Sequence, residues 1–228
     1  MLRSMTDLNG YAVRAADGNI GQVRDCYFDD ESWSVPFLVV DTGTWLTSRK
    51  VLISPRSIGR ANWEQKVLPV GLTREQVRNS PHIDAGKLVS REHEREFLGY
   101  YGYSPLPQVV REDSQLRSCR TMPGHRIMAT DGEIGHVETL LIDEQDWTVV
   151  YMVVKTGPVW GGYLVLIAPR WIRDACWPDC TLTVDLDRQT VREVPPYSGR
   201  HDDSVDEIMA ARVAPRRPAQ SSVLRRYG

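Results

Sequence analysis

Two nearly identical stretches, Val51-Leu52-Ile53-Ser54-Pro55-Arg56 and Val165-Leu166-Ile167-Ala168-Pro169-Arg170, lie 114 residues apart and reveal an internal repeat. The same shift aligns residues 8–81 with residues 122–195 without a gap, and 29 of the 74 aligned positions are identical. A period of this length is far too long for a solenoid and is typical of a duplicated domain. Each copy has about 75 residues, which is near the lower size limit for independent folding.

The strand signals of each copy are short and closely spaced. Asp17-Gly18 predicts a tight turn between the first two strands, because Gly takes a positive φ without a Cβ clash. Pro55 ends a later strand, since proline cannot donate to a ladder. The expected strands cover residues 11–16, 20–29, 35–40, 51–53 and 67–72, and the second copy repeats them between residues 126 and 186. This pattern predicts a mainly β fold with two small antiparallel β-barrels in tandem.

Short helices are expected between the copies and near the C-terminus. Thr73 with Gln76 forms a capping box, and Ser90 can cap a helix over residues 91–98. A second capping box at residues 204–207 precedes an apolar pair and predicts a short amphipathic helix. We therefore divide the chain into a first repeat (1–81), a linker with a short helix (82–121), a second repeat (122–196), and a short helix with a disordered basic tail (197–228).

The composition is that of an ordinary soluble protein. The 228 residues include 28 basic and 30 acidic side chains, and the net charge of -2 excludes a polycation built for nucleic acid. No apolar run approaches the roughly 18 residues that cross a bilayer. Residues 1–7 lack the apolar core of a signal peptide. We therefore expect a cytoplasmic protein without a transmembrane segment.

No residue pattern indicates catalysis or a cofactor. Cys176 and Cys180 have a spacing that zinc tolerates, but a structural zinc site needs a second ligand pair, which the sequence lacks. Gly18 and Gly21 lie between two strands, whereas a dinucleotide-binding fingerprint needs a helix after its glycines, so a turn and a bulge are expected. The histidines are dispersed, and none belongs to a nucleophile motif. We therefore predict a protein that is not an enzyme and holds no metal and no cofactor.

One loop differs strongly between the two copies. Residues 45–50 are polar and basic, whereas the equivalent residues 159–164 are aromatic and contain glycine. Either this loop packs against the other barrel or the linker, or it docks a partner, since Trp and Tyr are favoured interface anchors. On the docking interpretation, Trp160→Ser abolishes partner capture at nearly unchanged stability. The candidate partner-binding residues are Arg49, Lys50, Trp160, Gly161, Gly162 and Tyr163.

The C-terminal residues 212–228 form a basic tail that contains five arginines and no acid. Such a tail can bind RNA or an anionic membrane surface. The alternative is a disordered tail that only adds solubility. The arginines are Arg212, Arg216, Arg217, Arg225 and Arg226.

Several short motifs together resemble the PRC-barrel domain family. They are Gly10-Tyr11, the D-G-x-I-G-x-V pattern of Asp17–Val23, an acidic turn before Trp33, the L-V-V-D-T-G of Leu38–Gly43 and the V-L-I-S-P of Val51–Pro55. Residues 72–81, 89–94 and 100–102 are similar to segments that follow or link the barrels in bacterial tandem PRC-barrel proteins. The resemblance covers residues 2–196 and implies two PRC-type barrels.

This family includes the cytoplasmic domain of the photosynthetic reaction-centre H subunit and the C-terminal domain of the ribosome-maturation factor RimM. The resemblance therefore implies a non-enzymatic binding or scaffold module that docks on a larger assembly, with a protein as its expected partner. One alternative is an accessory of a photosynthetic reaction-centre or other electron-transfer complex, bound at a membrane complex. Another is a ribosome- or RNA-associated factor. Fold alone does not decide between them. Pairing of whole chains as a homodimer also stays open.

Overall fold

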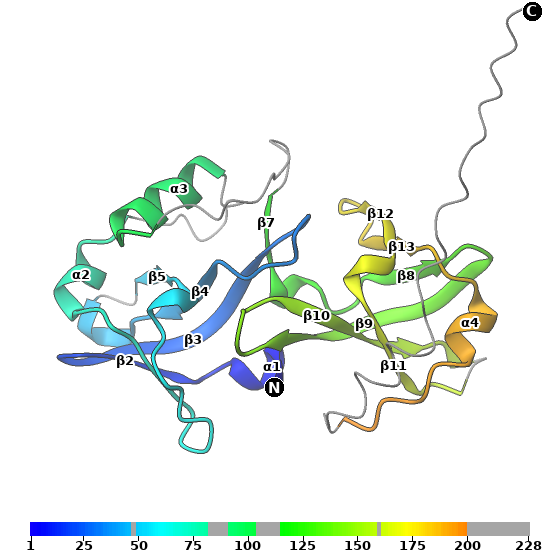
Figure 1. The fold of residues 1–228 in the computed structure, drawn as a ribbon, viewed down its shortest axis with the longest axis horizontal. Helices are drawn as coiled ribbons and strands as arrows, with labels where there is room; N and C mark the ends of the chain where they lie inside the picture. Colours follow the sequence, from blue (N-terminus) through cyan, green and yellow to red (C-terminus); the bar gives the residue numbers. More distant parts are fainter. Residues whose placement is uncertain (47–48, 82–90, 104–114, 159–160, 200–228) are drawn as a thin grey trace, which may run out of the picture.

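The computed structural model describes residues 1–46, 49–81, 91–103, 115–158 and 161–199, and it is mainly β with four short α-helices among these residues (Figure 1). Two sheets lie side by side, one built mostly from each repeat. The prediction of a mainly β chain with two repeated units and short helices is confirmed at this level.

The first sheet contains six strands. Its central strand is β3, and β4 and β2 flank it. The order along the sheet is β5 (Lys50–Ile53), β4 (Phe37–Asp41), β3 (Gly18–Asp29), β2 (Ala12–Ala15) and β6 (Val67–Pro69), with β7 (Leu116–Ser118) also paired to β3.

The second sheet has seven strands and the same central arrangement, with β9 in the place of β3. The order along the sheet is β11 (Leu164–Ile167), β10 (Val149–Thr156), β9 (Gly132–Asp143), β8 (Arg126–Ala129), β13 (Thr181–Val184) and β12 (Ile172–Cys176), with β1 (Leu2–Ser4) also paired to β9.

The expectation of purely antiparallel strands is wrong at one place in each sheet. Strand β6 runs parallel to β2, and β13 runs parallel to β8. A parallel neighbour needs a long crossover connection, because a tight hairpin can only reverse the chain. The chain supplies that crossover between β2 and β6 by passing through β3, β4 and β5 before it returns.

Two short strands cross between the repeats. Strand β1 lies at the start of the first repeat, before the aligned residues 8–81, but pairs with β9 of the second sheet, with Leu2 opposite Asp143. Strand β7 precedes the second repeat but pairs with β3 of the first sheet, with Leu116 opposite Asp29. Both strands have the sequence Leu-Arg-Ser, and the shift of 114 residues relates them. The two halves therefore exchange equivalent strands, so neither sheet is built from one repeat alone.

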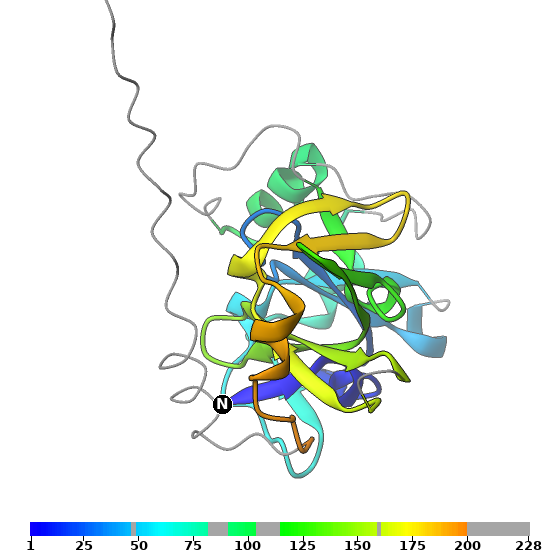
Figure 2. The same ribbon diagram turned by 90° about the vertical axis from the view of Figure 1, so that its right-hand side faces the viewer.

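The two repeats also meet through main-chain hydrogen bonds at equivalent positions. The Val35 amide donates to the Trp147 carbonyl at 2.7 Å, and the Val149 amide donates to the Trp33 carbonyl at 2.8 Å. One large hydrophobic core continues through both halves. Figure 2 shows the blue N-terminal strand beside the yellow-green strands of the second sheet. The fold is thus an intramolecular pseudo-dimer with a shared core.

Four short helices lie against the two sheets in the described residues, and three of them contact the central strands β3 or β9. They are α1 (Met5–Leu8), α2 (Arg74–Arg78), α3 (Arg91–Tyr100) and α4 (Arg188–Arg192). The predicted capping box is confirmed at α2, where the Thr73 hydroxyl accepts from the Gln76 amide at 3.2 Å and the Gln76 side chain accepts from the Thr73 amide at 2.8 Å. The helix expected after Ser90 is also confirmed as α3. The helix expected at residues 204–209 lies outside the described residues.

Two of the four cysteines are buried, and this gives a direct check of the strand exchange. Cys26 on β3 is 0% exposed and Cys119, which follows β7, is 3% exposed. Burial raises the pKa of both thiols well above the ordinary value. Since the thiolate is the reactive form, we expect Ellman's reagent to label only Cys176 and Cys180 in the native protein. All four thiols should react in denaturant. A third reactive thiol under native conditions would contradict the packing of β7 on β3.

Candidate functional site

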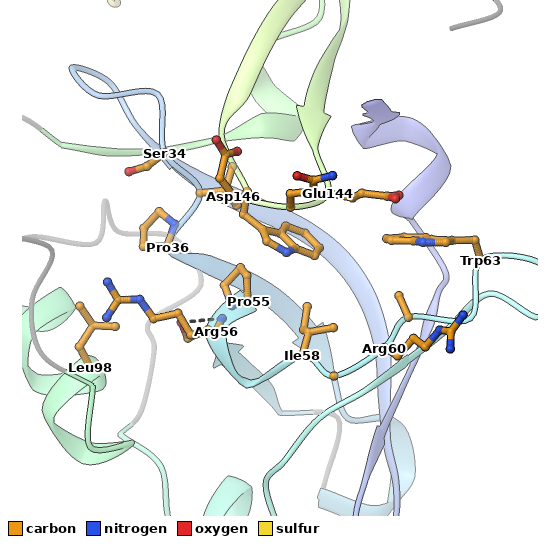
Figure 3. Close-up of a pocket in the computed structure, with 16 residues that line it drawn as sticks. Ser34, Pro36, Pro55, Arg56, Ile58, Arg60, Trp63, Leu98, Glu144 and Asp146 are labelled. Carbon is orange, nitrogen blue, oxygen red and sulfur yellow. Dashed lines mark hydrogen bonds between the residues drawn. The ribbon is translucent and has the colours of Figure 1, made fainter. Parts of the chain in front are cut away.

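A groove of about 740 Å³ lies at the junction of the two halves (Figure 3). One wall comes from the segment that follows β5, and the opposite wall comes from the turn between β9 and β10. Leu98 on α3 stands at one end and Trp63 at the other. This volume lies within the range of ordinary ligand pockets, so the groove can receive several side chains of a bound molecule.

The first wall follows from local sequence. Strand β5 ends at Ile53. The next residue is Ser54, whose hydroxyl accepts from the Arg56 amide at 3.4 Å and caps a short 3₁₀ helix, Pro55–Ser57. Proline at the start of this helix has the φ that the helix needs and lacks only an amide that would be unpaired. The chain therefore turns sharply and places Pro55 and Ile58 beside Pro36, which gives the wall an apolar surface.

The second wall is the turn of residues 144–147. The Gln145 amide donates to an Asp143 carboxylate oxygen at 2.8 Å, and the Trp147 amide donates to the Asp143 carbonyl at 2.9 Å. Trp147 has a φ of 55°, an uncommon conformation for a bulky residue. The turn thereby presents Trp147 to the groove, where its side chain is half-buried.

Trp63 is held at its end of the groove by a residue of the exchanged strand β1. The Arg3 guanidinium lies 4.4 Å from the centre of the Trp63 ring, and its Nε donates to Glu144 at 2.8 Å. The equivalent contact in the other half joins Arg117 to Trp177 at 4.6 Å. The strand exchange therefore fixes the orientation of one aromatic side chain of the groove.

The two copies of this junction are not equivalent. Trp33, the counterpart of Trp147, is only 8% exposed and stacks on Phe28 with ring centres 4.9 Å apart. The counterpart of Phe28 in the second repeat is the smaller Ile142, and Trp147 is half-buried. The two halves also differ in charge beside the tryptophans, because Gly59 and Arg60 in the first wall correspond to Arg173 and Asp174 in the other half.

The charges of the groove are divided between its walls. Arg56 and Arg60 are exposed on the first wall, and Glu144 and Asp146 belong to the second. Glu144 is paired with Arg3, whereas no described residue forms an ion pair with Arg60. An apolar floor between oppositely charged rims suits an extended peptide segment, because side chains can bury while polar groups pair at the edges.

The predicted docking loop is only partly described. Trp160 lies outside the described residues. Gly161 and Gly162 have φ values of 97° and 66°, and the Gly161 amide donates to the Pro158 carbonyl at 3.0 Å, so they form a turn. The Tyr163 side chain packs against the large core.

Arg49 and Lys50, the first-copy members of that prediction, behave differently from each other. The Arg49 guanidinium donates to the carbonyls of Arg78, Ser80 and Pro81 at 2.9, 2.5 and 2.8 Å. It thus holds the end of α2, with both terminal nitrogens donating within the chain. Lys50 is exposed at the start of β5. The five arginines of the basic tail, Arg212, Arg216, Arg217, Arg225 and Arg226, lie outside the described residues.

The groove residues were not among the candidate residues predicted from the sequence. The repeat alignment contains one usable signal, because Trp33 and Trp63 recur as Trp147 and Trp177. Near these repeated tryptophans the two copies differ at some positions, for example at Arg60 and its counterpart Asp174. Such differences indicate a surface that is present in one half only. The sequence-based prediction compared residues 45–50 with residues 159–164, and the described residues among them do not line the groove.

Within the described part of the chain, no group of three or more His, Cys, Asp or Glu side chains is arranged to hold a metal ion.

Gly18 and Gly21 lie at the start of β3, beside a register shift between Val13 and Arg14. The prediction of a turn and bulge at these glycines is therefore confirmed. Cys176 donates to an Asp179 carboxylate oxygen at 3.1 Å.

One carboxyl group, Asp25 on β3, fastens the exchanged strand. It accepts hydrogen bonds from the Ser118 hydroxyl at 2.5 Å, the Cys26 amide at 2.7 Å and the Arg120 amide at 3.1 Å. Burial nevertheless raises its pKa, and the hydrogen bonds only partly oppose this. The equivalent residue in the other half is Thr139, which has no charge to bury.

We expect Asp25→Thr to change the pH dependence of stability. The pKa of Asp25 in the folded protein lies above its ordinary value of 3.8, so its protonated form is favoured by folding. That contribution is complete below pH 3.8 and is lost as pH rises through the folded pKa. The stability of Asp25→Thr relative to wild type should therefore increase between about pH 3.5 and pH 7, as urea denaturation would measure. A constant difference would contradict the burial of this charge.

Comparison of the chain with protein-family models and with curated protein sequences gave no match. Among the described helices, none has the length and apolar character that a membrane crossing requires.

Proposed function

We propose that this chain is a non-enzymatic tandem PRC-barrel module that binds a segment of a protein partner in the junction groove. The observation that carries the proposal is the groove itself, in which half-buried Trp63 and Trp147 face an apolar wall under charged rims. Large aromatic side chains in a partly desolvated cleft are the usual centres of binding energy at protein interfaces.

The barrel part of the proposal is supported by the way each sheet bends back. After β5, the chain passes through Pro55–Ser57 and makes isolated bridges with the segment around β6, where Ile58 pairs with Val70 and Asn62 with Val67. In the other half, β11 continues through Pro169–Trp171 into β12, which pairs with β13. Small sheets that curl in this way remove free edges, which a stable adaptor needs to avoid.

The binding part is tested by partner capture with matched variants. Arg60→Asp gives the first wall the residue of its counterpart position, and Asp174→Arg makes the reverse change on the other half. Both positions are exposed, so we expect Tm to change by less than about 3 °C. Quantitative mass spectrometry after cross-linking in native lysate should show proteins whose recovery falls about tenfold or more with Arg60→Asp and stays unchanged with Asp174→Arg.

A second variant, Trp147→Ser, should lose the same proteins. If both Arg60→Asp and Trp147→Ser retain every protein that wild type captures, the groove is not the binding site. Sedimentation of the native lysate with and without RNase then assigns the class of partner. Comigration with a membrane complex would favour the reaction-centre-like alternative, and RNase-sensitive comigration with ribosomal particles would favour the RimM-like one.

A further inference from the structure

The main chain along the junction groove is poorly suited to pair with a bound strand. Pro36 and Pro55 on its wall have no amide hydrogen. Several other amides of the lining already donate to oxygen atoms of this chain, among them those of Val35, Ile58, Gly59, Glu144 and Trp147. A strand that adds to a sheet needs a row of unpaired main-chain groups, so the groove does not favour a partner in the β conformation.

The indole N–H groups of Trp63 and Trp147 are unused donors in this groove. Among the described residues neither group has a hydrogen-bond partner, whereas the indole of Trp45 donates to the Ile20 carbonyl. Neither indole nitrogen is enclosed, so a bound molecule can reach both. A ligand that uses these donors must present free carbonyl oxygens along its surface.

A polyproline II helix has both the free carbonyls and the apolar surface that the groove requires. It has no internal hydrogen bonds, whereas an α-helix uses nearly all of its carbonyls internally. Grooves that bind such segments are lined by aromatic side chains against which the proline rings pack. Figure 3 shows Pro55 and Ile58 along the groove between Leu98 at one end and Trp63 at the other, so apolar surface continues up to the tryptophan.

The rims of the groove determine which charges the ligand should carry. The exposed Asp146 carboxylate accepts from the Thr148 amide at 3.1 Å and has no ion-pair partner among the described residues, whereas Glu144 already pairs with Arg3. We propose that the occupant is a proline-rich segment of a protein partner in the polyproline II conformation, with a basic residue for Asp146 and an acidic one for Arg60. This inference rests on the proposed function, because it names the kind of partner that the same groove binds.

NMR of the full chain with synthetic peptides tests the inference at the two indoles. The probes are short runs of proline with an arginine at one end and a glutamate at the other, made in both orders. Among the seven tryptophans, the indole N–H signals of Trp63 and Trp147 should shift to saturation, because both groups gain an acceptor, and those of the buried Trp33 and Trp171 should not. Matched peptides with alanine in place of proline should bind about tenfold more weakly or worse, because they are not preorganised.

The inference is overturned if neither indole signal of the groove moves, or if the alanine peptides bind as tightly as the proline peptides. Capture from native lysate separates this failure from failure of the proposed function. If proteins that depend on Arg60 are recovered but no proline peptide binds, the proposed function stands and the inference is wrong. Proline peptides that bind and displace those proteins support both.

Asp146→Ser tests the charge of the ligand without disturbing the fold. The counterpart of Asp146 is Ser32, whose hydroxyl accepts from the Ser34 amide at 3.3 Å, so serine can keep the equivalent hydrogen bond. The variant should retain the Tm of wild type and bind the arginine-containing proline peptide about threefold more weakly at low salt. It should bind a peptide with glutamine in place of arginine as wild type does. An unchanged affinity for the arginine peptide would overturn the pairing with Asp146.

Discussion

Gly21→Ala is expected to destabilise the protein by about 4 kcal/mol or more, which is at the extreme of single substitutions. A Cβ atom at Gly21 would lie 2.0 Å from the Asp41 carbonyl oxygen and 2.9 Å from the Thr42 Cα. These are main-chain atoms of the neighbouring strand, so no side-chain rotation can relieve the clash. Strand β4 would have to move away from β3 and give up its ladder to do so.

The second repeat supplies an internal test of the same argument. Gly135 is the counterpart of Gly21, and a Cβ there would lie 2.0 Å from the Lys155 carbonyl oxygen. Gly135→Ala should therefore be as damaging as Gly21→Ala. Gly71→Ala is the control, because the nearest atom to its Cβ is 3.8 Å away, and its stability should change by less than about 1 kcal/mol. Guanidinium denaturation of the three variants measures all of these differences. A mild effect at Gly21 or Gly135 would mean that the strands approach less closely.

The close approach of the two strands explains why glycine is needed at this position, which the sequence pattern alone does not reveal. The motif Asp-Gly-x-Ile-Gly recurs in both copies, and its first glycine lies at the turn that the sequence predicts. The second glycine is needed for a contact with a strand some 20 residues later in the sequence. Local patterns can predict a turn, but the neighbour that excludes a side chain is known only once the sheet is assembled.

The strands, the duplication and the helix caps could be predicted because each depends on a local pattern. The capping box at Thr73 and the strand that Pro55 ends are examples. The groove could not, because its walls come from residues 54–63 and 144–147, which only the pseudo-dimer brings together. The parallel pairing of β6 and β13 likewise depends on the path of the whole sheet and not on the residues of those strands.

The exchange of β1 and β7 was beyond prediction for a different reason. Each strand has three residues, which is too short for a periodic pattern, and both have the sequence Leu-Arg-Ser. Identical sequences carry no preference for one sheet over the other. Proximity along the chain does not decide the pairing either. Strand β7 leads directly into the second repeat, yet it lies against β3, where Asp25 and Asp30 bind Ser118 and Arg117. In the other half, Glu144 binds Arg3.

Matched substitutions in these two strands should destabilise opposite sheets. Leu116 on β7 is 1% exposed and packs under α3, so Leu116→Asp would bury a charge without a partner. We expect a loss of about 3 kcal/mol or more, with hydrogen exchange accelerated first at the amides of β3 near Tyr27 and Asp29. Leu2→Asp should instead accelerate exchange in β9 near Leu141 and Asp143. Its effect should be smaller, because Leu2 is 8% exposed whereas Leu116 is 1% exposed.

The sheet in which hydrogen exchange accelerates distinguishes strand exchange from an arrangement in which each short strand pairs within its own repeat. If each strand paired within its own repeat, Leu2→Asp would deprotect β3 and Leu116→Asp would deprotect β9. The exchange also couples the stability of the two halves, since each sheet contains one strand, β1 or β7, that comes from the other half. Global unfolding of wild type should therefore be a single calorimetric transition, while the local loss of protection reports which sheet each strand completes. Two separate transitions together with hydrogen exchange accelerated in the strand of the same repeat would show that the repeats fold as independent units.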